Sequence, residues 1–307
     1  MNTVPAYHTL MLPLLKVMGS GIEMTTKQMR DSVAQLLDLS AEALNQRLPS
    51  GTQTAFDNRM GWARTYLFKA GLIERPRRAT YVISQSGRQL LANPPDSIDE
   101  KLLRSYEGFN EFLNAARTDG ESRSDVVDSS DNELTPEEQI EAGIRQIQRQ
   151  LRDEVLARVK QLPSEGFEQL VLRLLVGMGY GGSMADVRGV GRGADGGVDG
   201  VVNQDHLGLD RICIQAKRWE GSVGRPVIHA FVGALTGVGA TKGVMMTTSV
   251  YAQPAIEYVN KLTDRRIVLV DGDRMSDLML KHGIGVSTKQ TLILQRMDED
   301  FFLELES

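Results

Sequence analysis

Cysteine and histidine are scarce in this sequence of 307 residues. The single cysteine, Cys213, excludes an intrachain disulfide and is expected to pack within a strand. The four histidines are too scattered for a zinc-binding spacing; they are His8, His206, His229 and His282. No apolar run approaches the roughly 20 residues that span a bilayer, and the apolar patch at residues 10–15 lacks a basic leader and a cleavage site. We therefore expect a soluble, cytoplasmic protein without a membrane partner.

An excess of positive charge is also absent, because the net charge is −5. That value alone argues against a nucleic-acid partner, but the distribution of charge argues for one. Residues 1–92 carry 11 basic and 6 acidic side chains, residues 93–135 carry 4 and 11, and the remainder carries 20 and 23. Local positive potential, more than net charge, draws a protein to phosphate backbones. We therefore expect the first of these segments to bind nucleic acid.

The basic segment, residues 1–92, has the pattern of a small helical domain with a hairpin. Apolar spacing predicts helices from Tyr7 to Met18, from about Thr25 to Leu37 and from Arg59 to Ala70, with Gly71 as a C-terminal stop. Residues 72–75 and 80–83 predict two short strands around a basic turn. Helices followed by a hairpin predict a winged-helix DNA-binding domain.

Four arginines of this segment are candidate DNA contacts. Arg59 and Arg64 lie off the apolar stripe of the third helix, and Arg77 and Arg78 lie at the tip of the hairpin, within reach of phosphates or a minor groove. Any one of them could equally well solvate an exposed face. The four together, with the local excess of positive charge, favour DNA.

Residues 93–135 are expected to form an acidic linker, with one possible helix over 101–116. The linker ends at Thr135-Pro136-Glu137-Glu138, which has the composition of a helix N-terminus. Apolar residues then recur every three or four positions, at Ile140, Ile144, Ile147, Leu151, Val155, Val159 and Leu162. A single short stripe usually packs within its own chain, and pairing with a second copy is the alternative.

Residues 136–307 are expected to form a second domain. The pattern predicts helices at 165–178, 226–235, 252–262 and 273–281, strands between the first helix and Lys217, and further strands at 243–248 and 267–270. This order of helices and strands is typical of a mixed α/β sandwich.

The chemistry of this domain is predicted to lie on two strands, one at Val198-Asp199-Gly200 and one at Ile214-Gln215-Ala216-Lys217. Side chains two apart on a strand share a face, so Gln215 and Lys217 point the same way, and strand pairing can bring Asp199 beside them. A carboxylate and an amide oxygen suit Mg²⁺, and a lysine can orient water or stabilise phosphate charge. The pattern predicts a site for phosphodiester hydrolysis.

An aspartate and a lysine on neighbouring strands more often form a partly solvated surface pair. Three features favour a site. Glycines crowd the approach to Asp199, where a ligand or another backbone can come close. Asp195 lies in the same loop, although an aspartate beside glycine commonly serves a turn. Glu168 lies in the first turns of helix 165–178, from which it could point at the site.

Together these segments resemble the catalytic domain of the Mrr restriction endonucleases, a branch of the PD-(D/E)xK nuclease superfamily. The resemblance rests on Phe167-Glu168, Gly179-Tyr180-Gly181-Gly182, Gly193-Ala194-Asp195-Gly196-Gly197-Val198-Asp199-Gly200, Gln215-Ala216-Lys217-Arg218-Trp219 and Thr247-Thr248-Ser249. It extends to Val4-Pro5-Ala6-Tyr7 and Asn58-Arg59-Met60-Gly61-Trp62-Ala63 and covers nearly the whole chain. The acidic linker is the least alike.

The resemblance implies an α+β multidomain protein, in which an N-terminal winged helix precedes a C-terminal α/β restriction-endonuclease-like (PD-(D/E)xK) domain. It makes Asp199 the metal-holding carboxylate, Gln215 the second metal ligand, Lys217 the catalytic lysine and Glu168 a supporting ligand. Members of the superfamily commonly have an acidic residue where Gln215 stands. An amide oxygen carries less negative charge, so we expect weaker metal binding at this variant site.

The resemblance further implies an Mg²⁺-dependent endonuclease that restricts double-stranded DNA carrying methylated adenine or cytosine, and that assembles as a dimer or tetramer. Two alternatives remain open from the residues. One is a structure-specific nuclease of the Holliday-junction type. The other is a non-catalytic winged-helix regulator whose nuclease fold has decayed.

Overall fold

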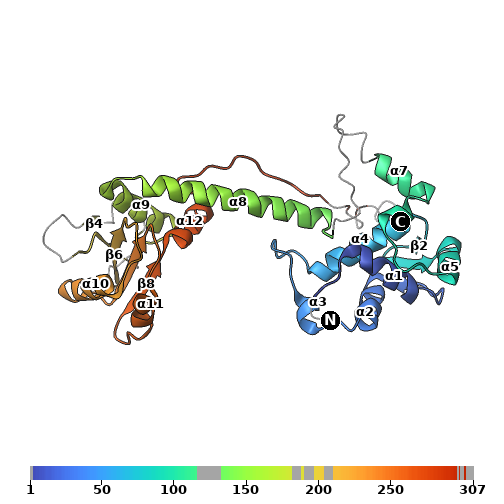
Figure 1. The fold of residues 1–307 in the computed structure, drawn as a ribbon, viewed down its shortest axis with the longest axis horizontal. Coiled ribbons are helices and arrows are strands. Elements are labelled where there is room, and N and C mark those ends of the chain that lie inside the picture. The colour runs from blue at the N-terminus through green and yellow to red at the C-terminus, as the bar shows by residue number, and fades with distance from the viewer. Residues whose placement is uncertain are drawn as a thin grey trace. The chain divides into compact units, whose positions relative to one another are not determined.

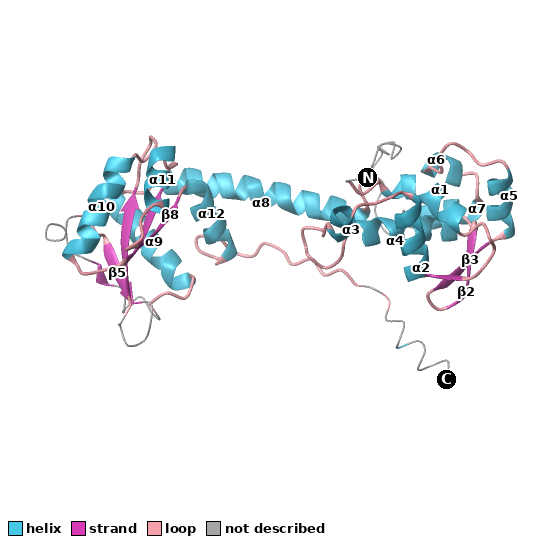
Figure 2. Ribbon diagram, turned by 90° about the horizontal axis from the view of Figure 1, so that it is seen from below, coloured by secondary structure: helices cyan, strands magenta, loops and turns pink. Residues whose placement is uncertain are grey.

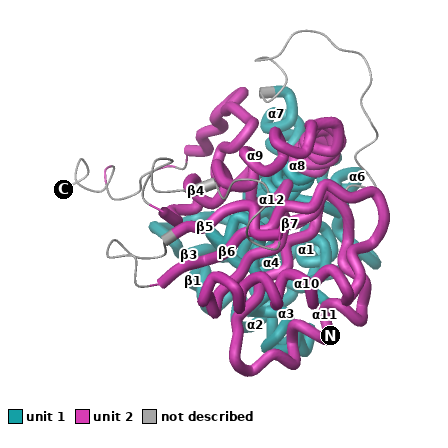
Figure 3. The backbone as a smooth tube through the Cα atoms, turned by 90° about the vertical axis from the view of Figure 1, so that its left-hand side faces the viewer, with its two compact units in different colours: residues 1–146 teal, residues 147–307 magenta. Residues whose placement is uncertain are grey.

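The computed structural model describes residues 3–115, 133–181, 188–189, 197–203, 210–295, 297 and 301. The chain divides into two compact units, residues 1–146 and 147–307, which Figure 3 shows in two colours. Each unit has its own hydrophobic core, formed, in the part of the chain that the structure describes, by one cluster of buried residues in unit 1 and two in unit 2. Among the described residues, no helix is long and apolar enough to cross a membrane.

Unit 1 is built of helices and a small antiparallel sheet whose strand order is β1-β3-β2 (Figures 1 and 2). The polar caps that the sequence provides explain its helix starts. Thr25 forms a capping box with Gln28, and Thr54 accepts from the backbone N–H of Asp57. The described elements are α1 (Tyr7–Val17), β1 (Met24–Thr25), α2 (Thr26–Leu36), α3 (Ala41–Asn45), α4 (Ala55–Lys69), β2 (Ile73–Arg77), β3 (Thr80–Ile83), α5 (Gln85–Ala92), α6 (Glu100–Leu103), α7 (Glu107–Ala115) and the first part of α8 (Pro136–Lys160).

The predicted N-terminal helices and hairpin correspond to α1, α2, α4, β2 and β3. Helix α4 begins at Ala55, before the predicted start at Arg59, because Thr54 provides an earlier cap. Its stripe of Met60, Ala63 and Leu67 is buried in the core of unit 1. This order of helices and strands agrees with the predicted one, and the winged helix itself stays a prediction.

Part of the expected acidic linker packs into unit 1. Ile98, Leu103 and Phe109 are fully buried in its core, and residues 101–116, where one helix was expected, contain α6 and α7. Acidic side chains lie between these buried apolar residues, so the apolar spacing is hard to recognise in the sequence.

The predicted helix start at Thr135 is confirmed. The N–H of Thr135 donates to the carboxylate of Glu138 (2.9 Å), and its hydroxyl accepts from the N–H of Glu138 (3.3 Å).

Unit 2 is a five-stranded sheet of order β4-β5-β6-β7-β8 with helices on both faces (Figure 1). The pairs β4–β5 and β5–β6 are antiparallel, and β6–β7 and β7–β8 are parallel. The expected mixed α/β sandwich is therefore confirmed. Its elements are the rest of α8, α9 (Ser164–Gly177), β4 (Arg188–Gly189), β5 (Gly200–Asn203), β6 (Arg211–Lys217), α10 (Arg225–Gly237), β7 (Lys242–Thr247), α11 (Gln253–Asn260), β8 (Arg266–Val270) and α12 (Gly272–Lys281).

Alternation along β6 sends its side chains into two cores. Ile214 lies in a cluster with Phe167 of α9 and Met275 of α12, whereas Cys213 lies in a cluster with Phe231 of α10. Cys213 is fully buried in its strand, as expected.

The apolar stripe on α8 is only partly covered. Its second half, from Val155, packs into the cluster that contains Phe167 of α9, and its first half is exposed, as at Ile147.

Candidate active site

The start of β5 places Asp199 beside β6. Gly200 pairs with Ile214, and the N–H of Asp199 donates to the Ile214 carbonyl (2.8 Å). Its side chain reaches further along the same strand, where Oδ2 accepts from the N–H of Ala216 (2.7 Å). The β5–β6 pairing ends at Gly200 and Ile214. Beyond this point, the Asp199 carboxylate accepts the hydrogen bond from β6 that a backbone carbonyl would accept in a continued strand pair. One carboxylate oxygen is held by backbone, and among the described contacts Oδ1 accepts no hydrogen bond.

Burial raises the pKa of Asp199 above its ordinary value. The N–H of Ala216 and the positive charge of Lys217 act in the opposite direction but do not offset it. The folded chain therefore holds this carboxylate at an electrostatic cost, which a bound cation would relieve.

The amide oxygen of Gln215 is buried and has no hydrogen-bond partner among the residues that the structure describes. The side chain is 4% exposed, and its Nε2 donates to the carbonyl of Gly197. That contact fixes the orientation of the amide, because only the NH₂ group can face a carbonyl. Oε1 is left buried with no hydrogen bond among the described residues. A buried unpaired oxygen costs about 1–3 kcal/mol, so an orphan in this position is itself a sign of a missing ligand.

Gly197 is required at its position for two reasons. Its φ of +106° lies in the region that side chains disfavour, and a Cβ atom there would lie 2.8 Å from Nε2 of Gln215. The glycine-rich approach to Asp199 was predicted to admit a ligand or another backbone. At Gly197 it admits the amide of Gln215.

Lys217 ends β6, two residues beyond Gln215, and its side chain is half-buried. Strand alternation places the two side chains on one face. Within the described part of the chain, its ammonium group forms no hydrogen bond or ion pair, and its charge acts on Asp199. The described geometry therefore brings Asp199 beside β6, with Gln215 and Lys217 on that strand.

The other two candidates, Glu168 and Asp195, come from other segments of the chain. Glu168 lies in α9 next to Phe167, which is buried in the cluster on the Ile214 face of the sheet. Its role as a supporting ligand stays a prediction. Asp195 lies outside the described residues.

The oxygen donors present fit a hard cation. Within the described ranges there is no group of three or more His, Cys, Asp or Glu side chains that could hold a metal. The carboxylate of Asp199 and Oε1 of Gln215 are oxygen ligands of the kind that Mg²⁺ accepts alongside water and substrate phosphate. The buried, unpaired state of Oε1 is the observation that favours such a ligand.

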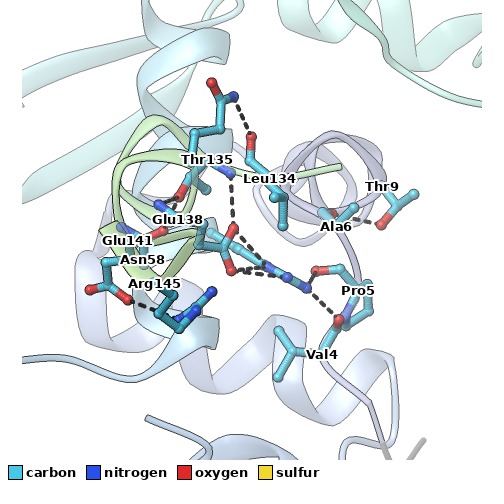
Figure 4. A network of polar contacts seen from close by, with 12 residues as sticks. Val4, Pro5, Ala6, Thr9, Asn58, Leu134, Thr135, Glu138, Glu141 and Arg145 are labelled. Carbon is cyan, nitrogen blue, oxygen red and sulfur yellow. Dashed lines mark hydrogen bonds and ion pairs between the residues drawn. The ribbon is translucent and has the colours of Figure 1, made fainter. Parts of the chain in front are cut away.

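Arg59, a candidate DNA contact, is engaged inside unit 1. Its Nε and Nη2 contact the carboxylate of Glu138 (3.0 and 2.9 Å), and Nη1 donates to the carbonyls of Val4 and Pro5 (2.6 and 3.2 Å). Figure 4 shows this network, in which Thr135 also bonds to Asn58. Arg59 thus ties the N-terminal segment and the start of α8 to α4.

The other three arginines lie nearer the surface of unit 1. The guanidinium of Arg64 lies over the ring of Tyr81 at 5.2 Å, and Arg77 is an exposed partner of Glu23 (2.7 Å). Arg78 is exposed in the same hairpin turn, before Ala79, whose φ is +52°. Their role in DNA binding stays a prediction.

Comparison with known proteins defines the class. Residues 159–279 match the family model described as restriction endonuclease, and residues 7–93 match the Mrr N-terminal domain. The chain is therefore an endonuclease. It is 32% identical over 306 residues to the type IV methyl-directed restriction enzyme EcoKMrr of Escherichia coli strain K12, covering 98% of this chain and 99% of that one. The chain thus belongs to the Mrr family, which confirms the resemblance drawn from its motifs.

Two solved structures of restriction endonucleases are more distant. The complex of MspJI with a 27-mer oligonucleotide aligns with a TM-score of 0.28 at 20% identity, over 52% of this chain and 35% of that one. FokI aligns with a TM-score of 0.27 at 12% identity, over 91% of this chain and 71% of that one. The family assignment rests on the sequence matches.

Proposed function

We propose that this endonuclease uses Mg²⁺ to cut double-stranded DNA that carries methylated adenine or cytosine. One observation supports the site above all others: the buried, unpaired oxygen of Gln215 on the strand whose backbone holds the carboxylate of Asp199. The methyl-directed activity named for the relative from Escherichia coli supports the choice of substrate.

In this proposal Asp199 and Gln215 hold the cation, with Glu168 as a supporting ligand. When bound, such a cation would supply positive charge to the scissile phosphate and would lower the pKa of a water molecule bound to it. Lys217 orients the attacking water and stabilises the charge that develops on the phosphate. The N–H of Ala216 keeps the Asp199 carboxylate in one orientation, so that its other oxygen can bind.

The N-terminal unit is proposed to choose the site on DNA. Arg64, Arg77 and Arg78 are its proposed contacts, because their guanidinium groups lie on a half-buried or exposed part of α4 and on the hairpin turn. Arg59 is not included, since its donors are engaged with Glu138 and the N-terminal carbonyls. The chain is proposed to assemble as a dimer or tetramer, because two active sites can cut both strands of one duplex together.

The test is incubation of purified chain with methylated and unmethylated plasmid, with Mg²⁺ and with EDTA. The proposal predicts cutting of methylated plasmid in Mg²⁺ alone. Equal inertness of both plasmids with a retained gel shift would instead favour a DNA-binding module. Preference for a four-way junction over methylated duplex would favour a structure-specific nuclease.

A further inference from the structure

An exposed tryptophan follows the proposed catalytic strand. Trp219 lies two residues beyond Lys217, just past the end of β6, and is 44% exposed. The indole is the largest of the side chains, and leaving so much of it in water forgoes burial that folding normally uses. An exposed aromatic residue beside a phosphodiester-cutting site is a candidate for contact with a base.

The backbone under this indole is held in place. The hydroxyl of Thr248, at the end of β7, accepts from the N–H of Trp219 and donates to its carbonyl, both at 3.0 Å. Thr248 is itself buried. Two reciprocal hydrogen bonds from one buried side chain fix the backbone of Trp219, so its indole projects from a rigid support.

Two cations line the same hollow. A cavity of about 440 Å³ is bounded by Lys160, Arg218, Trp219, Glu220 and Thr248. Arg218 reaches the C-terminal end of α8, where its Nη1 donates to the carbonyl of Lys160 (3.3 Å). That hydrogen bond uses one of the five N–H donors of Arg218. The other donors can bind a phosphate beside the ammonium group of Lys160.

We propose that this cavity binds the nucleotide that flanks the scissile phosphate. The base stacks on Trp219, and its phosphate contacts Arg218 and Lys160. The volume lies within the range of roughly 300–1,000 Å³ that holds small ligands, and an aromatic face with a basic rim is the combination that single nucleotides need. The inference rests on the proposed function, because the flanking nucleotide is defined as the one next to the phosphate that is cut at the site containing Lys217.

The first test is the fluorescence of Trp219. The chain has two tryptophans, so Trp62→Phe leaves Trp219 as the only indole, and Lys217→Ala prevents cutting. Methylated duplex is added while its binding is followed separately by anisotropy of a dye on the DNA. Stacking predicts quenching of the indole that saturates together with binding. Saturated binding with unchanged emission would overturn the inference.

The second test is cleavage by full-length variants. Trp219→Ala is expected to lower kcat/KM for methylated plasmid by roughly 5- to 150-fold, which corresponds to the usual energy of one base–aromatic stack. Trp219→Phe should restore most of this loss, and Trp219→Leu should not. Equal activity of the Phe and Leu variants would contradict stacking.

The matched control for charge is at the other end of the same strand. Arg218→Gln should lower kcat/KM about tenfold, whereas Arg211→Gln, at the exposed start of β6, should not change it. Equal melting temperatures for all variants exclude a folding defect as the cause. If the wild-type chain cuts no methylated plasmid, the proposed function fails, and the fluorescence test still decides whether a nucleotide binds at Trp219.

Discussion

At the scale of single residues, the site explains why a glutamine occupies the position where relatives in the superfamily commonly carry an acidic residue. The carbonyl of Gly197 faces the amide of Gln215 and needs a donor. A carboxylate at this position would set two acceptors against each other. The amide satisfies the carbonyl and leaves one oxygen for the proposed cation.

Gln215→Glu is therefore expected to impair the site, although it supplies the more common ligand. The lost hydrogen bond and the repulsion from the Gly197 carbonyl should lower stability by about 1–3 kcal/mol. Chemical denaturation measures this loss, and plasmid cutting at increasing Mg²⁺ measures the effect on the site. A stable variant that cuts at lower Mg²⁺ would show that the Gly197 contact does not determine the residue type.

Lys217→Ala should abolish cutting while DNA binding is kept. Removing one group that stabilises developing charge commonly costs about 100- to 1,000-fold in rate, so almost no product should form in the time that the wild-type chain needs to cut the plasmid. Lys242→Ala is the control, because Lys242 starts the neighbouring strand β7 and pairs with Asp210 at the surface. Turnover by the Lys217 variant at the wild-type rate would remove the lysine from the mechanism.

Asp199→Asn should stabilise the fold at neutral pH while abolishing cutting. Burial raises the pKa of Asp199, so the folded state binds this proton more tightly than the unfolded state. Wild-type stability is thus lost as pH rises through the range between the unfolded and folded pKa values, and asparagine removes that loss. The melting temperature of the variant should therefore exceed that of wild type at pH 7, and the difference should shrink as pH falls toward the ordinary pKa of an aspartate, about 4. A variant less stable than wild type at pH 7 would contradict this electrostatic cost.

At the scale of elements, the hairpin of β2 and β3 and the start of α8 carry the clearest consequences. Arg77→Ala combined with Arg78→Ala should weaken DNA binding at all sequences and flatten the plot of log affinity against log salt by roughly 2, since each phosphate contact contributes about 0.9. Arg104→Ala, at the exposed residue that directly follows α6, is the control. An unchanged slope would place the DNA contacts elsewhere.

Arg59→Ala should destabilise the chain rather than weaken DNA contacts directly. Glu138 is 8% exposed, and without its guanidinium partner its charge would be buried and uncompensated. Breaking such a pair costs about 3–5 kcal/mol. Denaturation of the single variant is compared with denaturation of the double variant Arg59→Ala with Glu138→Gln. The neutral amide should recover the part of the lost stability that comes from the unpaired charge of Glu138, and the rest comes from the lost contacts of Arg59. Unchanged stability of the single variant would contradict the structural role.

Sequence patterns were sufficient for the longer elements. Apolar spacing located α1, α2, α9 and α10, because those helices each bury one face, and β-branched residues located β5 and β6. Helices α3 and α6 are too short for periodicity to show. The hydrogen bond from Gln215 to the Gly197 carbonyl joins residues that are 18 apart in the sequence. It depends on how two strands diverge, so no local sequence pattern predicts it.

At the scale of the whole molecule, the chain combines two units with separate hydrophobic cores. The motifs for hydrolysis all fall in unit 2, and the basic excess falls in residues 1–92, within unit 1. The family and the fold class could be read from the sequence because the motifs lie in both units. The orientation of the proposed metal ligands could not, since it depends on the contacts of Gln215 with Gly197 and of Asp199 with the N–H of Ala216.

The most direct test of the central claim is the anomalous difference map of crystals grown or soaked with Mn²⁺, which takes the same oxygen ligands as Mg²⁺. The account predicts a peak in contact with the carboxylate of Asp199 and with Oε1 of Gln215. A fully occupied Mn²⁺ peak elsewhere, with Oε1 of Gln215 still unbound, would contradict it.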